Sequence, residues 1–175
     1  MTGRIFDIKE MTLHDGVGVR LTVFLKGCPL RCEWCHNPEG LKKEKQLLYK
    51  RVKCVECKLC KRPCTHEECQ PFSRCLHICP KDCLSVCGED WTSDALAEKL
   101  ASYKRIFDAC GGGVTFSGGE PLMQAEFLLE TIEKLKARGV HEIAVETSGY
   151  ASKEIFFGFS LKIAEFEEVF YNSIL

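Results

Sequence analysis

The pattern of apolar and polar positions predicts strands that alternate with helices. Residues 20–26, RLTVFLK, are rich in β-branched and aromatic side chains and end at Gly27, as a strand does before a turn. Residues 3–9 form an earlier strand, separated from this one by the turn DGVG. Two later apolar runs, VTF at 114–116 and the centre of HEIAVETSG at 141–149, predict further core strands.

Helical spacing appears before, between and after these later strands. Thr92 or Ser93 can cap a helix whose apolar positions recur at Leu96, Leu100, Tyr103 and Phe107. A second amphipathic helix carries Phe127, Leu128, Ile132 and Leu135 and is closed by Gly139, and SKEIFF at 152–157 begins another. The predicted fold class is therefore α/β, with a parallel sheet or part of a (β/α) barrel.

Three loops follow predicted strands: the run GCPLRCEWCHNPEG, the turn SGGEP and the turn ETSG. Active sites of α/β folds lie at the carboxyl ends of the strands. We therefore expect these loops to share one rim of the sheet.

Composition narrows the class of protein. The chain has 175 residues and a formal net charge of -1, which indicates one domain and gives no reason to expect nucleic acid or an anionic membrane as a partner. Apolar runs such as LTVFL are far too short to span a bilayer, and the N-terminus lacks the apolar core of a signal peptide. The expected location is cytoplasmic.

The chain contains 13 cysteines, most of them in short-spaced groups. Without an export signal, this pattern favours metal or cluster ligation over disulfides. Cys110, next to three glycines, is the exception and is predicted to be a small buried residue.

The first group is Cys28, Cys32 and Cys35, with the spacing C-x3-C-x2-C. Structural zinc sites take four ligands and an ordinary 4Fe–4S cluster takes four cysteines, so a loop that offers three leaves one iron open for catalysis. A zinc knuckle that uses His36 as the fourth ligand is the alternative. Zinc motifs usually pair two short ligand clusters, which this loop does not.

The second group lies in residues 41–91, a stretch that begins with a basic run and is then rich in cysteine. Cys54, Cys57, Cys60 and Cys64 have the spacing of a ferredoxin cluster motif. The following half is irregular: Cys69 and Cys75-x3-Cys79-Pro80 fit a second such motif, but Phe72 stands where its middle cysteine is expected. The basic run indicates a solvated face or a surface for an acidic partner.

Two-cluster ferredoxins exchange their fourth cysteines between clusters. One ligand set is then Cys54, Cys57, Cys60 and Cys79, and the other is Cys64, Cys69, Cys75 and either Cys83 or Cys87. Zinc is the alternative metal. His66 and His77 lie among these cysteines and could also ligate, although loop histidines are more often simply exposed.

The segment DGVGVRLTVFLKGCPLRCEWCHNPEG resembles the activating enzymes of glycyl-radical enzymes, in the radical S-adenosylmethionine superfamily. The match includes the continuation Trp34-Cys35-His36-Asn37-Pro38, and DGVG departs from the family's DGPG only at Val17. Gly118-Gly119-Glu120 matches the family's GGE motif. The resemblance covers residues 1 to about 152.

The resemblance implies a fold, cofactors and chemistry. It implies a partial (β/α) barrel with a ferredoxin-like insert, and one or two further 4Fe–4S clusters in that insert. It also implies a 4Fe–4S cluster on Cys28, Cys32 and Cys35 that reductively cleaves bound S-adenosylmethionine, so that the resulting radical takes a hydrogen from a glycine of a partner enzyme. The residues it implies for cofactor binding are Trp34, Cys35, His36, Gly118, Gly119, Glu120, Glu146 and Ser148.

The resemblance also implies partners and roles. The protein substrate is a glycyl-radical enzyme, near whose glycine loop DGVGVR would lie, and the electron donor is a flavodoxin or ferredoxin. In the implied site, Glu120 meets the ammonium of the cofactor and Glu146 bonds its ribose or its methionine part. The insert relays electrons or shapes the partner interface.

The predicted organisation has four parts: 1–40, the start of the radical S-adenosylmethionine core; 41–91, the insert; 92–152, the rest of the core; and 153–175, an atypical tail. The tail has no clean helix or strand period and suggests a truncated end, which would leave the strand near IAVET with an unpaired edge. Two rival functions remain. The first is an iron–sulfur electron-transfer protein, which would give SGGEP and the three-cysteine loop no role. The second is a zinc-binding interaction module, which metal analysis would distinguish.

Overall fold

The computed structural model describes residues 1–164 and 169–173 and divides into two compact units. The larger unit comprises Met1–Glu44 with Gly88–Leu175, and the smaller unit is Lys45–Cys87. None of the helices in the described part of the chain combines the length and apolar character that a bilayer crossing requires.

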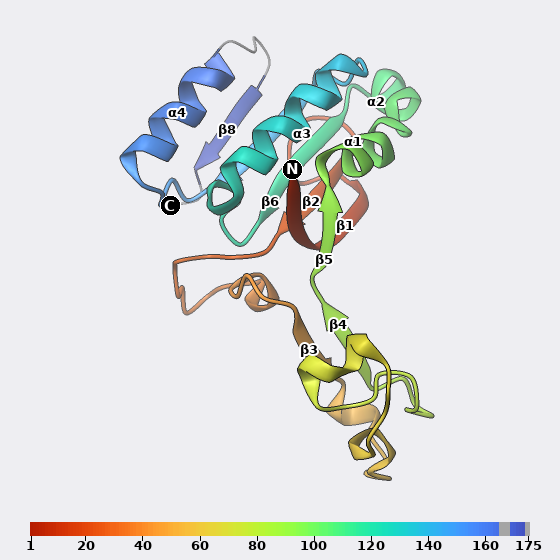
Figure 1. The fold of residues 1–175 in the computed structure, drawn as a ribbon. Helices are drawn as coiled ribbons and strands as arrows, with labels where there is room; N and C mark the ends of the chain where they lie inside the picture. Colours follow the sequence, from red (N-terminus) through yellow and green to blue (C-terminus); the bar gives the residue numbers. More distant parts are fainter. Residues whose placement is uncertain (165–168, 174–175) are drawn as a thin grey trace. The chain divides into compact units, whose positions relative to one another are not determined.

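The larger unit is built on a six-stranded sheet with the order β5-β1-β2-β6-β7-β8 (Figure 1). Its strands are β1 (Thr2–Thr12), β2 (Arg20–Leu25), β5 (Glu89–Thr92), β6 (Gly113–Gly118), β7 (Ile143–Thr147) and β8 (Val169–Ser173). The four neighbouring strands β2, β6, β7 and β8 are parallel to one another, whereas β1 is antiparallel to both β2 and β5. The expected parallel α/β sheet is thus present.

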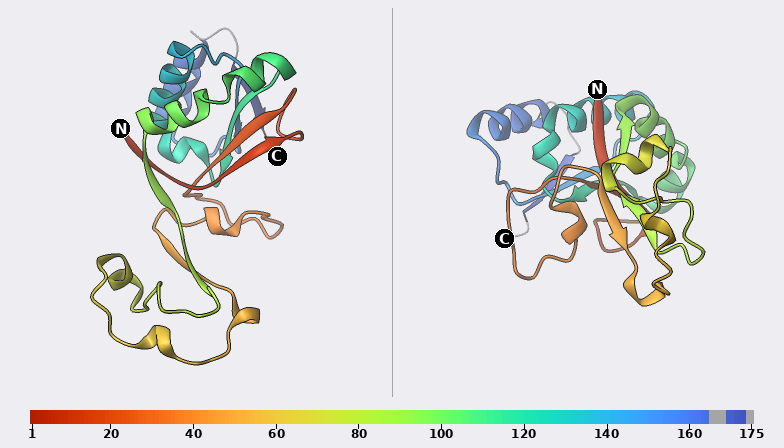
Figure 2. Two further views of the ribbon diagram at one scale, coloured as in Figure 1. Left: turned by 90° about the vertical axis from the view of Figure 1, so that its right-hand side faces the viewer. Right: turned by 60° about the horizontal axis from the view of Figure 1, so that its bottom comes forward.

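Four helices belong to this unit: α1 (Ser93–Ala101), α2 (Lys104–Cys110), α3 (Ala125–Ala137) and α4 (Lys153–Ala164). Helices α1, α3 and α4 lie on the same side of the sheet (Figure 2). Alternate strand residues such as Leu21, Val23 and Phe116 pack with Leu128 and Ile132 of α3 in one buried core. Because side chains alternate across a strand, the polar residues between them face the other side.

The helix boundaries follow local signals, with one difference. The Thr92 hydroxyl accepts a hydrogen bond from the Ala95 N–H at 3.2 Å and caps α1, and Gly139, at a φ of +80°, follows the end of α3. The apolar repeat from Leu96 to Phe107 predicts one helix, but α1 and α2 are separate. The Ser102 hydroxyl donates to the Lys99 carbonyl at the break, a local bond that competes with helix continuation.

Two predictions about the later chain are wrong. Cys110 is exposed, because it is the last residue of α2 and only Phe107 of that helix is buried. In the described part of the segment after 152, α4 begins where SKEIFF predicts a helix, but β8 then pairs in parallel with β7 from Ile143↔Val169 onward, so the expected free edge is wrong. The strand IAVET therefore has neighbours on both sides. Phe166 lies outside the described residues.

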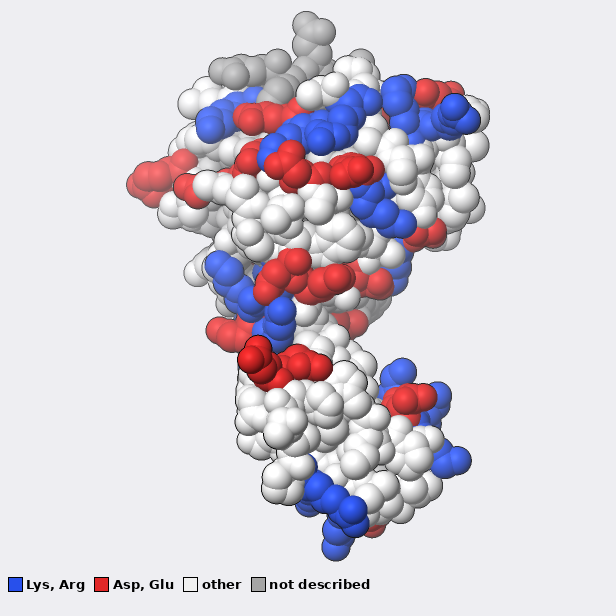
Figure 3. Space-filling model, turned by 45° about the vertical axis from the view of Figure 1, so that its right-hand side comes forward, with Lys and Arg blue, Asp and Glu red and all other residues white. Residues whose placement is uncertain are grey.

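The outer face of the larger unit carries acidic and basic side chains side by side (Figure 3). Lys134 on α3 is an example: its ammonium lies 2.6 Å from an Asp94 oxygen and 2.8 Å from a Glu130 oxygen. Such interleaved charges are typical of a solvated helix surface.

The smaller unit has little regular structure. Strand β3 (Gln46–Tyr49) pairs antiparallel with β4 (Leu84–Cys87), and the loops contain the 3₁₀ turns η2 (Arg51–Lys53), η3 (Leu59–Lys61) and η4 (Glu67–Phe72). Its buried apolar side chains are Cys69, Cys75, Cys83, Leu84 and Cys87. Units this small usually need metals or disulfides to fold, so a core made mainly of thiols indicates metal ligation.

Candidate cluster-binding site

Three loops meet at the carboxyl ends of β2, β6 and β7, which are adjacent parallel strands. Backbone hydrogen bonds join the first two: the Gly119 N–H donates to the Leu25 carbonyl at 2.9 Å, and the Glu120 N–H donates to the Gly27 carbonyl at 2.7 Å. The turn that contains Ser148 is bonded to the side chain of Glu120. The expected shared rim is therefore formed.

The cysteine loop begins at this rim and returns to it. The Gly27 N–H bonds the Gly40 carbonyl at 2.7 Å, and the Cys28 N–H bonds the Leu41 carbonyl at 3.1 Å, so the loop is closed at its base next to the turn η1 (Pro38–Gly40). Cys28, Cys32 and Cys35 are all partly exposed. The loop thus presents three thiols that a cluster can reach from solvent.

Charge near Cys28 shows which groups face it. Burial raises the pKa of the Cys28 thiol, and the carboxylate of Glu120 and the thiols of Cys32 and Cys35 raise it further, while a hydrogen bond from the Leu30 backbone acts against them. The three cysteines and Glu120 therefore lie within electrostatic range of one another. A positively charged iron centre among them would relieve this repulsion.

Gly119 is required by close backbone packing. A Cβ at this position would lie 2.4 Å from the Gly27 carbonyl oxygen and 2.6 Å from that of Gly40. No side chain fits between the two ends of the cysteine loop. The second glycine of the GGE motif, Gly119, therefore allows the turn after β6 to contact the base of that loop.

Glu120 is fully buried and joins the ends of β6 and β7. One carboxylate oxygen accepts hydrogen bonds from the Leu122 N–H at 3.0 Å and the Thr147 hydroxyl at 2.5 Å. The other accepts from the Ser148 N–H at 2.8 Å and the Ser148 hydroxyl at 2.6 Å. Two donors at each oxygen occupy the usual acceptor positions of a carboxylate. In this arrangement Glu120 acts as a clamp, and its contact with a cofactor stays a prediction.

The remaining predicted cofactor residues lie around the same strands. Trp34 is 65% exposed, and His36 is also exposed. Glu146 on β7 is half-buried and belongs to the set of residues on the sheet face opposite the helices. Hydrogen bonds and backbone packing bring Gly118, Gly119, Glu120 and Ser148 together. Among the described residues, these contacts do not include Trp34, His36 or Glu146.

The stretch DGVGVR is held by buried polar contacts at the start of β2. The Arg20 guanidinium, only 2% exposed as a residue, donates to the Thr115 hydroxyl at 2.7 Å and to the Val114 carbonyl at 2.9 Å. Burial lowers the pKa of Arg20, and the charges of Glu142, Asp15 and Glu146 oppose that change. The Asp15 carboxylate accepts from the Thr22 hydroxyl at 2.5 Å. These contacts order the turn.

In the smaller unit, one set of thiols surrounds a small cavity. Cys54, Cys57, Cys60 and Cys79 line it, together with Cys83. The Cys83 N–H donates to the Cys79 sulfur at 3.3 Å, and the Glu56 N–H donates to the Cys54 sulfur at 3.3 Å. The four cysteines expected to form the first ligand set are therefore near one another.

A second set contains Cys64, His66, Cys69 and Cys75. Their ligand atoms, three sulfurs and an imidazole nitrogen, all lie within 4.8 Å of one another. Neither expected fourth ligand joins them: Cys83 lines the other cavity, and Cys87 lies in β4 opposite Gln46. His66 was a secondary candidate in the sequence. The missing cysteine at position 72 and the spacing Cys64-x-His66 are the signals that could have ranked it higher.

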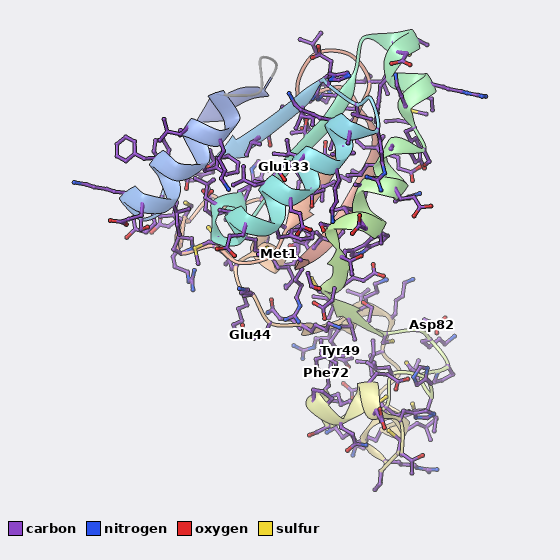
Figure 4. All side chains as sticks on the ribbon, turned by 45° about the horizontal axis from the view of Figure 1, so that its top comes forward. Met1, Glu44, Tyr49, Phe72, Asp82 and Glu133 are labelled. Carbon is purple, nitrogen blue, oxygen red and sulfur yellow. The ribbon has the colours of Figure 1, made fainter. Side chains whose placement is uncertain are left out.

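A cavity of about 640 Å³ also lies in the larger unit, between residues that include Met1 and Glu44, both labelled in Figure 4. Its lining contains none of the three loop cysteines and no residue of the GGE motif. This cavity is therefore separate from the candidate ligand side chains.

Comparison with known proteins places these motifs in a family context. The sequence model of the 4Fe-4S single cluster domain matches residues 14–169. The match includes the three-cysteine loop, the cysteines of the smaller unit and the GGE motif.

Curated relatives are similar across most of the chain. The 4-hydroxyphenylacetate decarboxylase activating enzyme of Clostridium scatologenes is 40% identical over 88% of this chain. The choline trimethylamine-lyase activating enzyme of Oleidesulfovibrio alaskensis is 38% identical over 97%, and the (2S)-3-sulfopropanediol dehydratase activating enzyme of Klebsiella oxytoca is 35% identical over 85%.

The chain spans little more than half the length of these relatives, with 55%, 59% and 52% of each covered in turn. Among solved structures, QueE from Escherichia coli aligns over 85% of this chain and 53% of its own, with a TM-score of 0.46 and 22% identity. That likeness is too slight to argue from.

Proposed function

Because the chain belongs to the 4Fe-4S single cluster domain family, we propose that it acts as an activating enzyme for a glycyl-radical enzyme. One observation supports this more than any other. Three partly exposed thiols stand in a loop that has no fourth cysteine, and this loop is hydrogen-bonded to the GGE turn at the carboxyl ends of parallel strands.

The residues present suit the proposed cluster. Three cysteine thiolates are a ligand set for iron, and the loop offers three, which leaves one iron for a small molecule. When bound and reduced, a 4Fe–4S cluster supplies the electron that cleaves S-adenosylmethionine, and the carbon radical so formed takes a hydrogen from a glycine of the partner.

The chain's own residues bind the cluster and orient the cofactor. Cys28, Cys32 and Cys35 hold the cluster, and the Gly118-Gly119 backbone lies close enough to the loop to meet the amino-acid part of the cofactor. Glu120 keeps the β6 and β7 turns together, so that Ser148 and Glu146 border the same space. Trp34 and His36, both exposed, complete the loop around it.

The fold that we propose is a partial (β/α) barrel of the radical S-adenosylmethionine type, carried by residues 1–40 and 92–152 and continued by α4 and β8. Residues 41–91 form a ferredoxin-like insert. Four parallel strands with three helices on one side are consistent with such a barrel, since these barrels carry their helices outside.

We assign one 4Fe–4S cluster of the insert to Cys54, Cys57, Cys60 and Cys79. Their spacing is that of a ferredoxin and they line one cavity. This cluster relays electrons from a flavodoxin or ferredoxin donor. The relatives are named for different partner enzymes, so the partner of this chain is proposed only as a class.

The test compares Cys32→Ala with Cys57→Ala in the full chain, reconstituted with iron and sulfide without oxygen. Electron paramagnetic resonance spectra of the reduced proteins are recorded with and without S-adenosylmethionine. We expect the cofactor to change the spectrum of the wild type and of Cys57→Ala, and not that of Cys32→Ala. If the cofactor changes the spectrum of Cys32→Ala as it does that of the wild type, the assignment of the open cluster is wrong.

A second measurement separates enzyme from electron carrier. The proposed function requires the chain to bind S-adenosylmethionine and to cleave it when reduced. A wild-type protein that carries its iron–sulfur clusters but neither binds nor cleaves the cofactor would be an electron-transfer protein.

A further inference from the structure

The second half of the insert contains a ligand set of its own. Cys64, His66, Cys69 and Cys75 bring their four ligand atoms within 4.8 Å of one another. Within the described ranges 1–164 and 169–173, this is the only group of three or more His, Cys, Asp or Glu side chains found this close. We infer that these four residues hold a single zinc ion, separate from the iron–sulfur clusters.

The distances favour one ion over a cluster. With Zn–S bonds of about 2.3 Å and a Zn–N bond of about 2.0–2.1 Å, the ligand atoms of a tetrahedral site lie about 3.5–3.8 Å apart. The Cys75 sulfur and the His66 Nδ1 are 3.8 Å apart. In a 4Fe–4S cluster each thiolate binds a different iron at a different corner, so its ligands must stand further apart.

The other thiols of the chain support this contrast. Cys54, Cys57, Cys60 and Cys79 share a cavity but do not form a comparably tight group. The two halves of the insert therefore differ in geometry, although both are rich in cysteine. A cluster fits the first half and a single ion fits the second.

Backbone groups around the second half are arranged as in metal–thiolate loops. The Leu76 N–H donates to the Cys69 sulfur at 3.3 Å. The Gln70 amide donates to the Cys64 carbonyl at 2.9 Å and so holds the first ligand's loop. Such outer contacts orient ligands for a metal.

The amino-acid sequence explains why the ligand set is mixed. A ferredoxin motif would place a thiol at position 72, where this chain has Phe72, labelled in Figure 4, and a phenyl ring cannot bind a metal. His66, which lies between Cys64 and Cys69, supplies the fourth ligand instead. Three cysteines and one histidine are a standard set for structural zinc.

The zinc ion has a structural consequence. Two of its ligands, Cys69 and Cys75, are among the few buried apolar side chains of the smaller unit. Structural zinc contributes directly to folding. We therefore expect the ion to hold the loop from Cys64 to Cys75 in place.

The test uses the full chain, purified and reconstituted with iron and sulfide, and measures zinc and iron together. We expect stoichiometric zinc in addition to iron in the wild type. His66→Ala should bind zinc at least about tenfold more weakly in competition with a chelator, since removing even an outer partner of a zinc ligand costs about 10–100-fold in affinity.

His77→Ala is the matched control. His77 lies next to His66, with ring centroids 4.6 Å apart, but its Nε2 is 2.7 Å from a Glu68 oxygen and it is not in the ligand set. We expect His77→Ala to keep zinc as the wild type does. His66→Cys should keep it as well, since it replaces nitrogen with a thiolate.

X-ray absorption at the zinc edge gives a readout that does not depend on activity. We expect three sulfur neighbours and one nitrogen neighbour in the wild type and four sulfurs in His66→Cys. Two outcomes would overturn the inference. One is zinc retention by His66→Ala equal to that of the wild type. The other is a wild-type protein that holds iron and sulfide but no zinc.

Discussion

Replacement of Glu120 by glutamine tests whether this carboxylate acts as a clamp between strand ends. Its two oxygens accept four hydrogen bonds from Leu122, Thr147 and Ser148. An amide keeps one acceptor oxygen and puts an NH₂ donor in place of the other. The Ser148 N–H then faces another donor and cannot reorient, whereas the Ser148 hydroxyl can turn to accept.

The magnitude follows from the lost bonds. A hydrogen bond to a charged group contributes about 1.5–3 kcal/mol, and Glu120→Gln removes the bond from the Ser148 N–H inside a buried site. We expect a loss of about 2–3 kcal/mol in the free energy of unfolding. For a chain of this size, 1 kcal/mol shifts Tm by about 2–4 °C, so the expected decrease is about 4–12 °C.

The assay is thermal unfolding of the full chain followed by circular dichroism, with binding of S-adenosylmethionine measured on the same samples. Glu133→Gln is the control, because Glu133 is an exposed residue of α3 (Figure 4), and exposed substitutions usually change stability by less than about 0.5 kcal/mol. A Tm for Glu120→Gln within about 2 °C of the control, together with lost cofactor binding, would refute the clamp. Glu120 would then be a direct cofactor ligand.

Three further predictions follow from single residues. Gly119→Ala should lower Tm and prevent cluster loading, because its Cβ would meet backbone oxygens at 2.4 and 2.6 Å. Gly158→Ala is the control and should be neutral or slightly stabilising, because nothing lies within 4 Å of its Cβ. Thermal unfolding and iron analysis compare the two variants. Arg20→Leu should cost about 2–4 kcal/mol in denaturant unfolding, since the Val114 and Glu142 carbonyls lose their buried donor, and equal midpoints for variant and wild type would contradict this. Hydrogen bonds from Lys134 and the N-terminus lower the pKa of Glu130 to about 2, so its contribution is complete above the ordinary carboxyl pKa and is lost as pH falls toward 2. The Tm difference between wild type and Glu130→Gln should therefore shrink from pH 6 to pH 2. A difference that stays constant over this range would show that the pKa of Glu130 is not lowered by folding.

Much of the fold could be predicted from local pattern alone. The strands at β2, β6 and β7 and the helix α3 follow from runs and periods within a few residues, because the repeat of side-chain direction is a property of the backbone. The shared rim could be predicted too, since the carboxyl ends of adjacent parallel strands lie on one edge. The spacing of Cys28, Cys32 and Cys35 is local in the same sense.

Other features depend on contacts between distant residues. The expectation that β7 has a free edge failed because β8, more than twenty residues later, pairs with it, and a weakly patterned segment gives no local sign of such pairing. The Glu120 contacts with Thr147 and Ser148 span 27 and 28 residues. They exist only because the sheet places β6 next to β7.

The insert shows the same division within a short segment. The sequence by itself determined which thiols are candidate ligands, since cysteine chemistry and the ferredoxin spacing depend only on neighbouring positions. Only the tertiary structure decided how they are grouped. The loop from Cys64 to Cys75 folds back so that His66 joins three sulfurs, while Cys83 lies with the other set. Ligand type is a property of a residue, but a ligand set is a property of distances that the folded chain establishes.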